Sequence, residues 1–276
     1  MTVLTSVTAL LPLAVVAVMY WRRARTLARR GMPVPRWRQA MFALALVLAT
    51  TAQLMPYEDD LFFVHMLQHV VLGDLAALAF VIGLTGPLLR PILAVGPLSR
   101  VRVLAHPLVA LPLWAFSLYL WHLPPLYEGA VRHDAVHALE HVSFFGTGVL
   151  MWAAVVEVLP GPEWFGTGAK FGYVAVVRVL ETVLGNVFIW SGDVVYDVYA
   201  RGDERLGISP HEDQGLAGTI MMVEGSLVTI GALAWLFLKL AREGELRQRL
   251  LEEGFDPRTV RRAVRYGRGE ELESAR

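Results

Sequence analysis

The stretch LFFVHMLQHVVLGDLAALAFVIG, residues 61–83, decides the fold class of this chain. It is long and apolar enough to cross a lipid bilayer, which takes about 20 largely apolar residues in a helix. It nevertheless holds His65, His69 and Asp74. Because such side chains are costly in lipid, they normally face the interior of a helix bundle or a polar cavity. The stretch therefore predicts a membrane helix with one polar face.

The composition of the whole chain agrees with a membrane protein. Of its 276 residues, 55% are hydrophobic, the mean hydropathy is +0.48 and the formal net charge is zero. The chain has no cysteine, which excludes disulfides, thiolate zinc sites, iron–sulfur clusters and thiol redox chemistry. The sequence also lacks a phosphate-binding glycine loop and a nucleic-acid-binding signature, so nucleic acid is not an expected partner.

Seven segments of the chain are long and apolar enough to be membrane helices. They are residues 2–21, 39–56, 61–83, 107–124, 135–159, 171–192 and 215–241. We therefore predict an all-α, polytopic membrane protein with seven transmembrane helices.

The arginine residues set the expected orientation, because Lys and Arg accumulate in cytoplasmic loops. They are dense in the loops 22–38 and 84–106 and in the C-terminal tail. The alternate loops, at 57–60, 124–134 and 191–214, are acidic or poor in bases. This pattern predicts an N-terminus outside the cell and a cytoplasmic C-terminus.

Two regions are expected, a seven-helix transmembrane domain at 1–242 and a charged cytoplasmic helical tail at 243–276. The hydrophobicity falls sharply where the tail begins. Asp256 followed by Pro257 is typical of a helix N-cap with proline at the first helical position. The tail is therefore expected to hold two short helices. The alternative is a solvated tail that only helps to orient the last membrane helix.

Two pairs of histidines lie on the side that is expected to face outward. His65 and His69 are four residues apart, a spacing that puts two side chains on one helix face. His137 and His141 repeat this spacing at a similar depth in the fifth expected helix. Imidazoles spaced in this way can reach one ion, and imidazole favours copper, zinc, iron or nickel. We therefore predict these four histidines as metal ligands.

Further side chains at this level are candidates for the same site. His122 ends the fourth expected helix, and His211 precedes the seventh. Met66, Met221 and Met222 also lie in this layer. Thioether and imidazole ligands without a thiolate suit copper that changes between two oxidation states. The alternative is structural, because single membrane histidines often hydrogen-bond a neighbouring helix and methionine is a common packing residue.

Charged residues form a second group within the expected membrane helices. They are Asp74, Arg178, Glu181 and Glu224. Arg178 is the strong cation of this layer, so we predict that it pairs with one of the three carboxylates. Such a cluster either holds helices together or conducts protons or ions. Glu140 follows His137 by three residues, which positions it to accept a bond from a ligand imidazole and fix its tautomer.

Four separate motifs occur along the chain in a specific order and spacing. They are HMLQHVVL (65–72), WHLPPLY (121–127), HALEHVSF (137–144) and SPHEDQGLAGTIMM (209–222). In these motifs the sequence resembles the CtaG family of caa3-type cytochrome c oxidase assembly factors, which are bacterial seven-span membrane proteins. The resemblance covers roughly residues 40–240. The matching positions are His65, His69, His122, His137, His141, Asp213 and Gln214.

This resemblance implies a role in maturing the haem–copper oxidase, by delivery of copper to the subunit that carries the binuclear centre. The chain departs from the family pattern in its last helix, where Met222 and Glu224 replace a common tryptophan and proline. This departure puts the type of oxidase that is served in question.

We therefore expect a cytochrome c oxidase assembly factor that is not an enzyme. It would bind copper on the extracytoplasmic side of the bacterial cell (inner) membrane and deliver it to the apo-oxidase. Its partners would be the copper ion, the lipid bilayer and a haem–copper oxidase subunit or a periplasmic copper chaperone. Glu212, Asp213 and His211 are expected at the mouth of the site, where they would attract the cation.

Three alternatives stay open at this point. In a haem-binding protein, one histidine from each pair would ligate iron, and a Soret band would reveal it. A metal or proton transporter would use the charged layer, and flux into sealed vesicles would reveal it. A di-iron membrane oxygenase with histidine boxes would carry its boxes on the cytoplasmic side, so a topology reporter in the 124–134 loop would reveal it.

Overall fold

All regular elements in the computed structural model, which describes residues 3–96 and 100–274, are helices. The seven expected segments fall on seven helical stretches within these ranges. They are α1 (Val3–Arg29), α2 (Arg36–Gln53), α3 with η1 and α4 (Phe62–Gly83), α7 (Pro107–Trp121), α9 (Asp134–Val156), α10 (Thr167–Trp190) and α12 (Pro210–Glu252). The all-α fold class is confirmed, while residue 2, the expected start of the first segment, lies outside the described residues.

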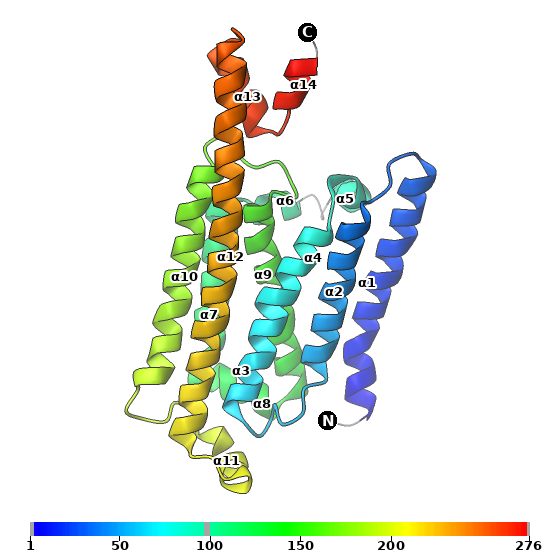
Figure 1. The fold of residues 1–276 in the computed structure, drawn as a ribbon. Helices are drawn as coiled ribbons and strands as arrows, with labels where there is room; N and C mark the ends of the chain where they lie inside the picture. Colours follow the sequence, from blue (N-terminus) through cyan, green and yellow to red (C-terminus); the bar gives the residue numbers. More distant parts are fainter. Residues whose placement is uncertain (1–2, 97–99, 275–276) are drawn as a thin grey trace.

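Four helices in the described part of the chain are long and apolar enough to cross a membrane. They are Phe62–Gly83, Asp134–Val156, Thr167–Trp190 and Pro210–Glu252. Helix α7 is apolar but has only 15 residues. The structure thus supports a membrane protein with several spans, while the count of seven and the orientation stay predictions. Helix α1 begins at one end of the bundle and α12 ends at the other (Figure 1), as an odd number of spans requires.

The short helices close the two ends of the bundle. They are α5 (Gly86–Leu93), α6 (Val101–Leu104), α8 (Pro124–Arg132), η3 (Asp197–Tyr199), α11 (Ala200–Leu206), α13 (Pro257–Arg265) and α14 (Gly269–Ser274). Helices α8 and α11 lie at the end where α3 begins, whereas α5 and α6 lie at the other end (Figure 1). We call the end with α8 and α11 the α8 end.

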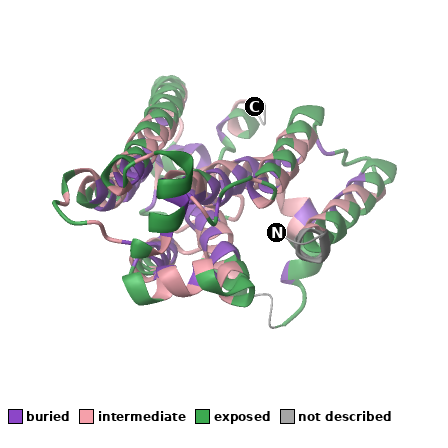
Figure 2. Cartoon of the chain, turned by 90° about the horizontal axis from the view of Figure 1, so that it is seen from below, coloured by how far each residue is buried: buried purple, intermediate pink, exposed green. Residues whose placement is uncertain are grey.

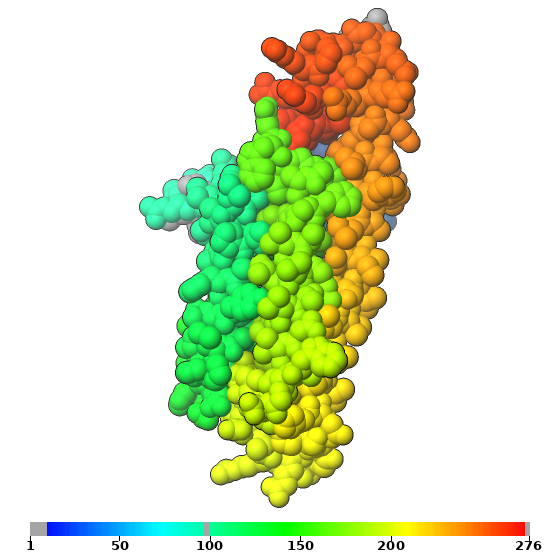
Figure 3. All heavy atoms as spheres, turned by 90° about the vertical axis from the view of Figure 1, so that its left-hand side faces the viewer, coloured from blue at the N-terminus to red at the C-terminus, as the bar shows by residue number. Residues whose placement is uncertain are grey.

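The long helices pack in pairs along their length. Helix α10 packs along α12, α7 along α9 and α2 along α4. Buried residues face the centre of the bundle, while the outward faces are exposed (Figure 2). On α10 the large exposed side chains are apolar, namely Val176, Val179, Val183, Val187 and Trp190. Figure 3 shows this face of the molecule, where α10 lies beside α12. An apolar outer surface of this kind is typical of contact with lipid.

Two glycines bring the backbones of α9 and the third long helix into contact. A Cβ atom on Gly148 of α9 would overlap the carbonyl oxygen of Gly73. Gly73 itself lies in the π-helical segment Val71–Ala76, labelled η1 here, which joins α3 to α4. Small residues allow such close approach between membrane helices. The two helices that carry the histidine pairs are therefore packed with their backbones in close contact at this point.

The C-terminal tail folds back on the end of α12, which runs without a break past residue 242 to Glu252. Asp256 caps α13 as the sequence predicts, since its side chain accepts a bond from Thr259 N at 2.9 Å. A small apolar cluster of Leu250, Val260 and Val264 joins the tail to α12. The division into domains at 242 stays a prediction.

Candidate metal centre

The start of α3 is fixed by a carboxylate from α12. The Asp213 side chain is buried and accepts bonds from the backbone N–H groups of Phe62 and Phe63, at 2.7 and 2.8 Å. An acidic group at a helix N-terminus satisfies otherwise unpaired N–H groups and favours the helix dipole. Asp213 was expected to attract a cation at the mouth of the site. Instead, it lies inside the bundle as a helix cap, one turn before His65.

Four side chains from α3 and α9 converge at the α8 end of the bundle. They are His65, His69, His137 and Glu140, whose potential ligand atoms all lie within 4.8 Å of one another. Glu140 Oε2 lies 3.5 Å from His69 Nε2 and 3.8 Å from His65 Nε2. Ions of this class bind nitrogen and oxygen at about 2.0–2.2 Å, so atoms that share one ion lie roughly 3–4 Å apart. The two distances to Glu140 fall in this range, and a small side-chain movement would bring the rest of this group, which we call the outer centre, around one ion.

The outer centre presents lone pairs that no described residue satisfies. The Nδ1–H group of His65 donates to the Glu58 carbonyl oxygen at 3.3 Å, which leaves Nε2 of this ring as a free acceptor. His65 Nε2, His137 Nε2, both ring nitrogens of His69 and both carboxylate oxygens of Glu140 are buried, and none has a hydrogen-bond partner within the described ranges. Because buried polar groups are normally paired, so many unpaired polar atoms in one place, with at least one acceptor on each of His65, His69 and Glu140, indicate a site for a cation.

His141 lies beside the outer centre rather than within it. Its ring is hydrogen-bonded at both nitrogens, with Gln53 Nε2 3.1 Å from Nδ1 and Gln68 Oε1 3.2 Å from Nε2. The amide group of Gln68 donates in turn to the carboxylate of Glu58 and the carbonyl oxygen of Ala52. These bonds engage the lone pair that His141 would need as a ligand. Glu140, expected to orient a ligand imidazole, takes the fourth position instead.

Glu58, which anchors this hydrogen-bond network, lies in the loop before α3. It is buried, and burial together with the neighbouring charge of Asp59 raises the pKa of Glu58 to about 7. Its backbone carbonyl orients His65 and its carboxylate binds Gln68. The loop 57–61 therefore holds two polar groups of α3 in position.

The methionines and His122 separate into two environments. Met66, Met221 and His122 line a cavity of about 60 Å³ that begins at His69. Met222 faces α10, where its sulfur lies 3.8 Å from the guanidinium of Arg178. Sequence reasoning placed all three methionines in one layer, but neighbouring residues on a helix point in different directions, so only Met66 and Met221 reach the cavity.

The charged cluster is present, and Arg178 lies near Glu181, one of the three carboxylates with which it was predicted to pair. Arg178 lies 4.0 Å from the carboxylate of Glu181 and donates to the backbone oxygen of Met222 at 3.0 Å. Asp74 accepts a bond from Trp152 Nε1 at 2.5 Å and is hydrogen-bonded to Glu224. A bond between two carboxyl groups requires a shared proton. Asp74 is thus held by a tryptophan and a second acid rather than by arginine.

His211 and Glu212 lie at the surface of the α8 end. His211 is exposed and its Nε2 lies 3.1 Å from the Gly192 carbonyl oxygen. Glu212 forms a capping box with Ser209 at the start of α12. Both residues are accessible from the side of the outer centre, but their contacts are those of a loop and a helix cap.

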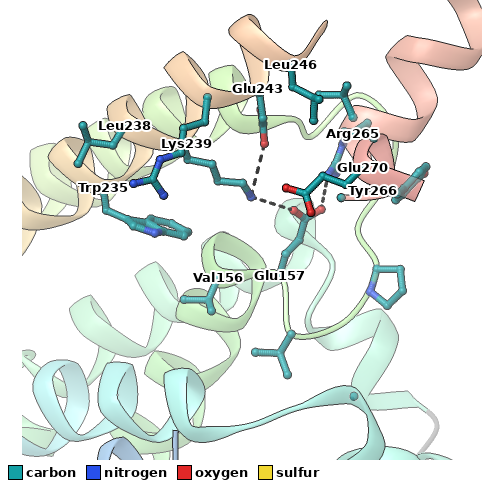
Figure 4. Close-up of a pocket in the computed structure, with 17 residues that line it drawn as sticks. Val156, Glu157, Trp235, Leu238, Lys239, Glu243, Leu246, Arg265, Tyr266 and Glu270 are labelled. Atoms are coloured by element: carbon teal, nitrogen blue, oxygen red, sulfur yellow. Dashed lines mark ion pairs between the residues drawn. The ribbon is translucent and has the colours of Figure 1, made fainter. Parts of the chain in front are cut away.

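A larger hollow of about 840 Å³ lies at the opposite end, between α9, α12 and the tail (Figure 4). Its charges are paired around Glu157, which lies 2.5 Å from Arg265 and 3.9 Å from Lys239 (Figure 4). The buried Lys170 binds the same carboxylate at 2.7 Å. This cluster ties the tail to the bundle, and it contains none of the predicted site residues.

Sequence reasoning missed three side chains that support the site. Gln53 and Gln68 satisfy His141, and Trp152 donates to Asp74. A signal for Gln68 was present, because a polar residue three positions after His65 in an apolar helix faces the same side. Trp152 carries no such signal, since tryptophan is common in apolar helices.

Comparisons with known proteins agree with this architecture. Residues 18–243 match the model of the family described as cytochrome c oxidase caa3 assembly factor (Caa3_CtaG). Uncharacterized proteins of Mycobacterium bovis and Mycobacterium tuberculosis are each 26% identical over 251 residues, which cover 83% of this chain and 38% of theirs. One of Mycobacterium leprae is 23% identical over 219 residues, or 72% and 33%.

The chain thus spans little more than a third of the length of these relatives. No solved structure matches it. The family match covers most of the chain and includes all four motifs and both helices of the outer centre. The chain belongs to the family of cytochrome c oxidase caa3 assembly factors.

Proposed function

We propose that this protein binds copper at the outer centre and delivers it to the apo-oxidase during assembly. The observation that carries the proposal is the group of His65, His69, His137 and Glu140, three of them buried and His137 partly buried, with ligand atoms within 4.8 Å of one another. Three imidazoles and a carboxylate suit a first-row ion such as copper, zinc or iron. The family description, which concerns an oxidase that contains copper, favours copper among these ions.

The protein binds and transfers its cargo without catalysis in this proposal. It works in the bacterial inner membrane with the outer centre on the extracytoplasmic side, as the arginine distribution predicts. Its receiving partner is a haem–copper oxidase subunit or a periplasmic copper chaperone. Ligand exchange is feasible because His137 and His69 belong to different helices, and His137 is only partly buried.

The size of the adjacent cavity favours an ion over haem. It measures about 60 Å³, well below the roughly 300 Å³ of the smaller pockets that hold organic ligands. The rings of His65 and His137 are stacked with centroids 4.9 Å apart, a distance that leaves no width for a porphyrin between them. The haem alternative therefore has less support than copper.

The experiment is to purify the full chain in detergent after growth with copper and to measure bound metals by mass spectrometry. We expect copper in the wild-type protein and its loss in the variant that carries His65→Ala and His69→Ala. A matched control carries His106→Ala and His211→Ala, which also removes two imidazoles but leaves the outer centre intact. Copper that persists in the first variant, or a wild-type protein that holds iron or a Soret band instead, would overturn the proposal.

A further inference from the structure

The cavity beyond the outer centre joins the histidine layer to the charged cluster. It is bounded by helices α3, α7, α9, α10 and α12. Its polar lining consists of His69 and His122 together with the carboxylic side chains of Asp74, Glu181 and Glu224. Asp74 follows His69 by five residues, which corresponds to about 7 Å along the helix axis. The cavity therefore begins at a ligand of the outer centre and leads deeper into the bundle.

His122 presents a free lone pair to this cavity. Its Nδ1–H donates to the carbonyl oxygen of Leu118 at 2.7 Å, so Nε2 is the acceptor of the ring. The residue is 8% exposed, and Nε2 has no hydrogen-bond partner from any described residue. A backbone bond that fixes the opposite nitrogen is the arrangement that orients metal-ligating histidines. The geometry of His122 is therefore that of a ligand, although it lies outside the outer centre.

Two thioethers share the cavity with this imidazole. Met66 and Met221 are 1% and 5% exposed, and both line the cavity. Thioether and imidazole together select soft ions, Cu(I) in particular. The volume of about 60 Å³ exceeds the 10–15 Å³ that one water needs, so an ion has room.

The carboxylic side chains of the cavity compensate the charge of a cation. Glu224 Oε1 is buried and has no hydrogen-bond partner in the part of the chain that the structure describes. Arg178, the cation of this layer, is turned toward Met222 and Ser226, to which it donates at 3.0 and 2.8 Å. Because Glu181 lies 4.0 Å from Arg178 and Asp74 shares a proton with Glu224, the negative charge that faces the cavity is the single charge of the Asp74–Glu224 pair, which matches one monovalent cation.

From these features we propose that the cavity is a second cation site, which takes Cu(I) from the outer centre through His69 as the shared ligand. His122 and the sulfurs of Met66 and Met221 bind the ion there, and the carboxylates balance its charge. The ion moves by exchange of ligands with no change of oxidation state, so the step needs no electron donor. This inference rests on the proposed function of the outer centre.

The test uses Ag(I), a redox-inactive analogue of Cu(I), titrated into the purified full chain in detergent. We expect two silver ions for each wild-type chain. Met221→Leu and His122→Phe should each weaken one of the two ions at least tenfold. Met151→Leu is the matched control, because it removes an equally buried thioether outside the cavity, and it should keep both ions.

The outcomes separate the two proposals. The variant with His65→Ala and His137→Ala should keep the inner ion alone. A wild-type protein with a single ion that this variant loses would overturn the second site and leave the outer centre intact. If Met221→Leu binds two silver ions as tightly as the wild-type protein, the second cation site is also overturned. Met221→Leu gives this answer even if His122→Phe fails to fold. A wild-type protein without silver would overturn both proposals.

Discussion

Replacement of Glu140 by Gln should stabilise the metal-free protein while it weakens copper binding. Glu140 is fully buried, and its nearest polar neighbours at the outer centre are the Nε2 atoms of His69 and His65, at 3.5 and 3.8 Å. Neither carboxylate oxygen has a hydrogen-bond partner among the described residues. In the absence of an ion, the protein therefore carries an unsatisfied buried carboxylate, which glutamine replaces without a change of shape.

The expected magnitudes follow from this environment. An unsatisfied buried polar group costs about 1–3 kcal/mol, and more when it is charged. The amide of Glu140→Gln can donate to His65 Nε2, which is an acceptor because Nδ1 binds Glu58. We therefore expect the metal-free protein to gain about 1–3 kcal/mol, with a rise in melting temperature of about 2–4 °C for each kcal/mol. Copper affinity should fall at least tenfold, or about 1.4 kcal/mol, because loss of even an outer-sphere carboxylate costs about that much.

The assay is thermal unfolding of metal-stripped protein in detergent, followed by tryptophan fluorescence, together with competition for copper. Glu128→Gln is the matched control, because Glu128 forms a surface ion pair with Arg132 at 2.6 Å and lies outside the outer centre. Such pairs contribute little, so the control should stay within about 0.5 kcal/mol of wild type. A metal-free Glu140→Gln protein that is less stable than wild type would refute this reasoning, and unchanged copper affinity would remove Glu140 from the ligand set.

Three further predictions concern regions around the site. Glu157→Gln should lower the free energy of unfolding, measured by chemical denaturation, by about 3–5 kcal/mol, because it leaves the buried Lys170 unpaired. Adding Lys170→Met should restore most of this loss, and a double variant no more stable than the single one would contradict the argument. Burial and the adjacent Asp213 raise the pKa of Asp203 to about 7, so the folded state binds this proton more tightly than the unfolded state and the free energy of unfolding should fall as the pH rises from about 4 to about 7. Asp203→Asn should flatten this slope in melting curves recorded across the range. Gly148→Ala should lower the free energy of unfolding by about 1–3 kcal/mol and also lower copper affinity, because the added Cβ overlaps a backbone carbonyl oxygen of the facing helix. The same competition assay measures the affinity, and an unchanged value would show that the spacing of the two helices does not determine the geometry of the site.

The sequence predicted the helices well because their apolar lengths are set by the bilayer. The spacing of His65 and His69 also predicted a shared face, and their ring centroids lie 4.3 Å apart. The same rule holds for His137 and His141, at 4.1 Å. Spacing within one helix is thus a sound guide to which side chains lie together on that helix.

Contacts between helices were not predictable in the same way. His141 was a natural ligand by spacing, but partners from two other helices, Gln53 and Gln68, engage both of its nitrogens. Of the three carboxylates predicted as partners of Arg178, it approaches Glu181 of its own helix, while Asp74 binds Trp152 of α9, a contact that the spacing did not predict. These outcomes depend on the rotation of each helix about its axis, which tertiary packing sets and which no single helix encodes.

The π-helical segment Val71–Ala76 affects how the side chains of the third long helix are placed around its axis, and thereby the geometry of the site. A π-turn holds one residue more than the α-helix would need over the same length. A chain shortened by one residue here would regain regular α-helical winding, while the helix beyond would keep its rotation, because the wide turn accommodates the extra residue locally. Asp74 lies inside the segment, so it would turn by up to about 100°, the angle of one residue at 3.6 per turn, while His69 would stay in place. The extra residue thus sets where the acidic end of the cavity lies relative to its histidine end.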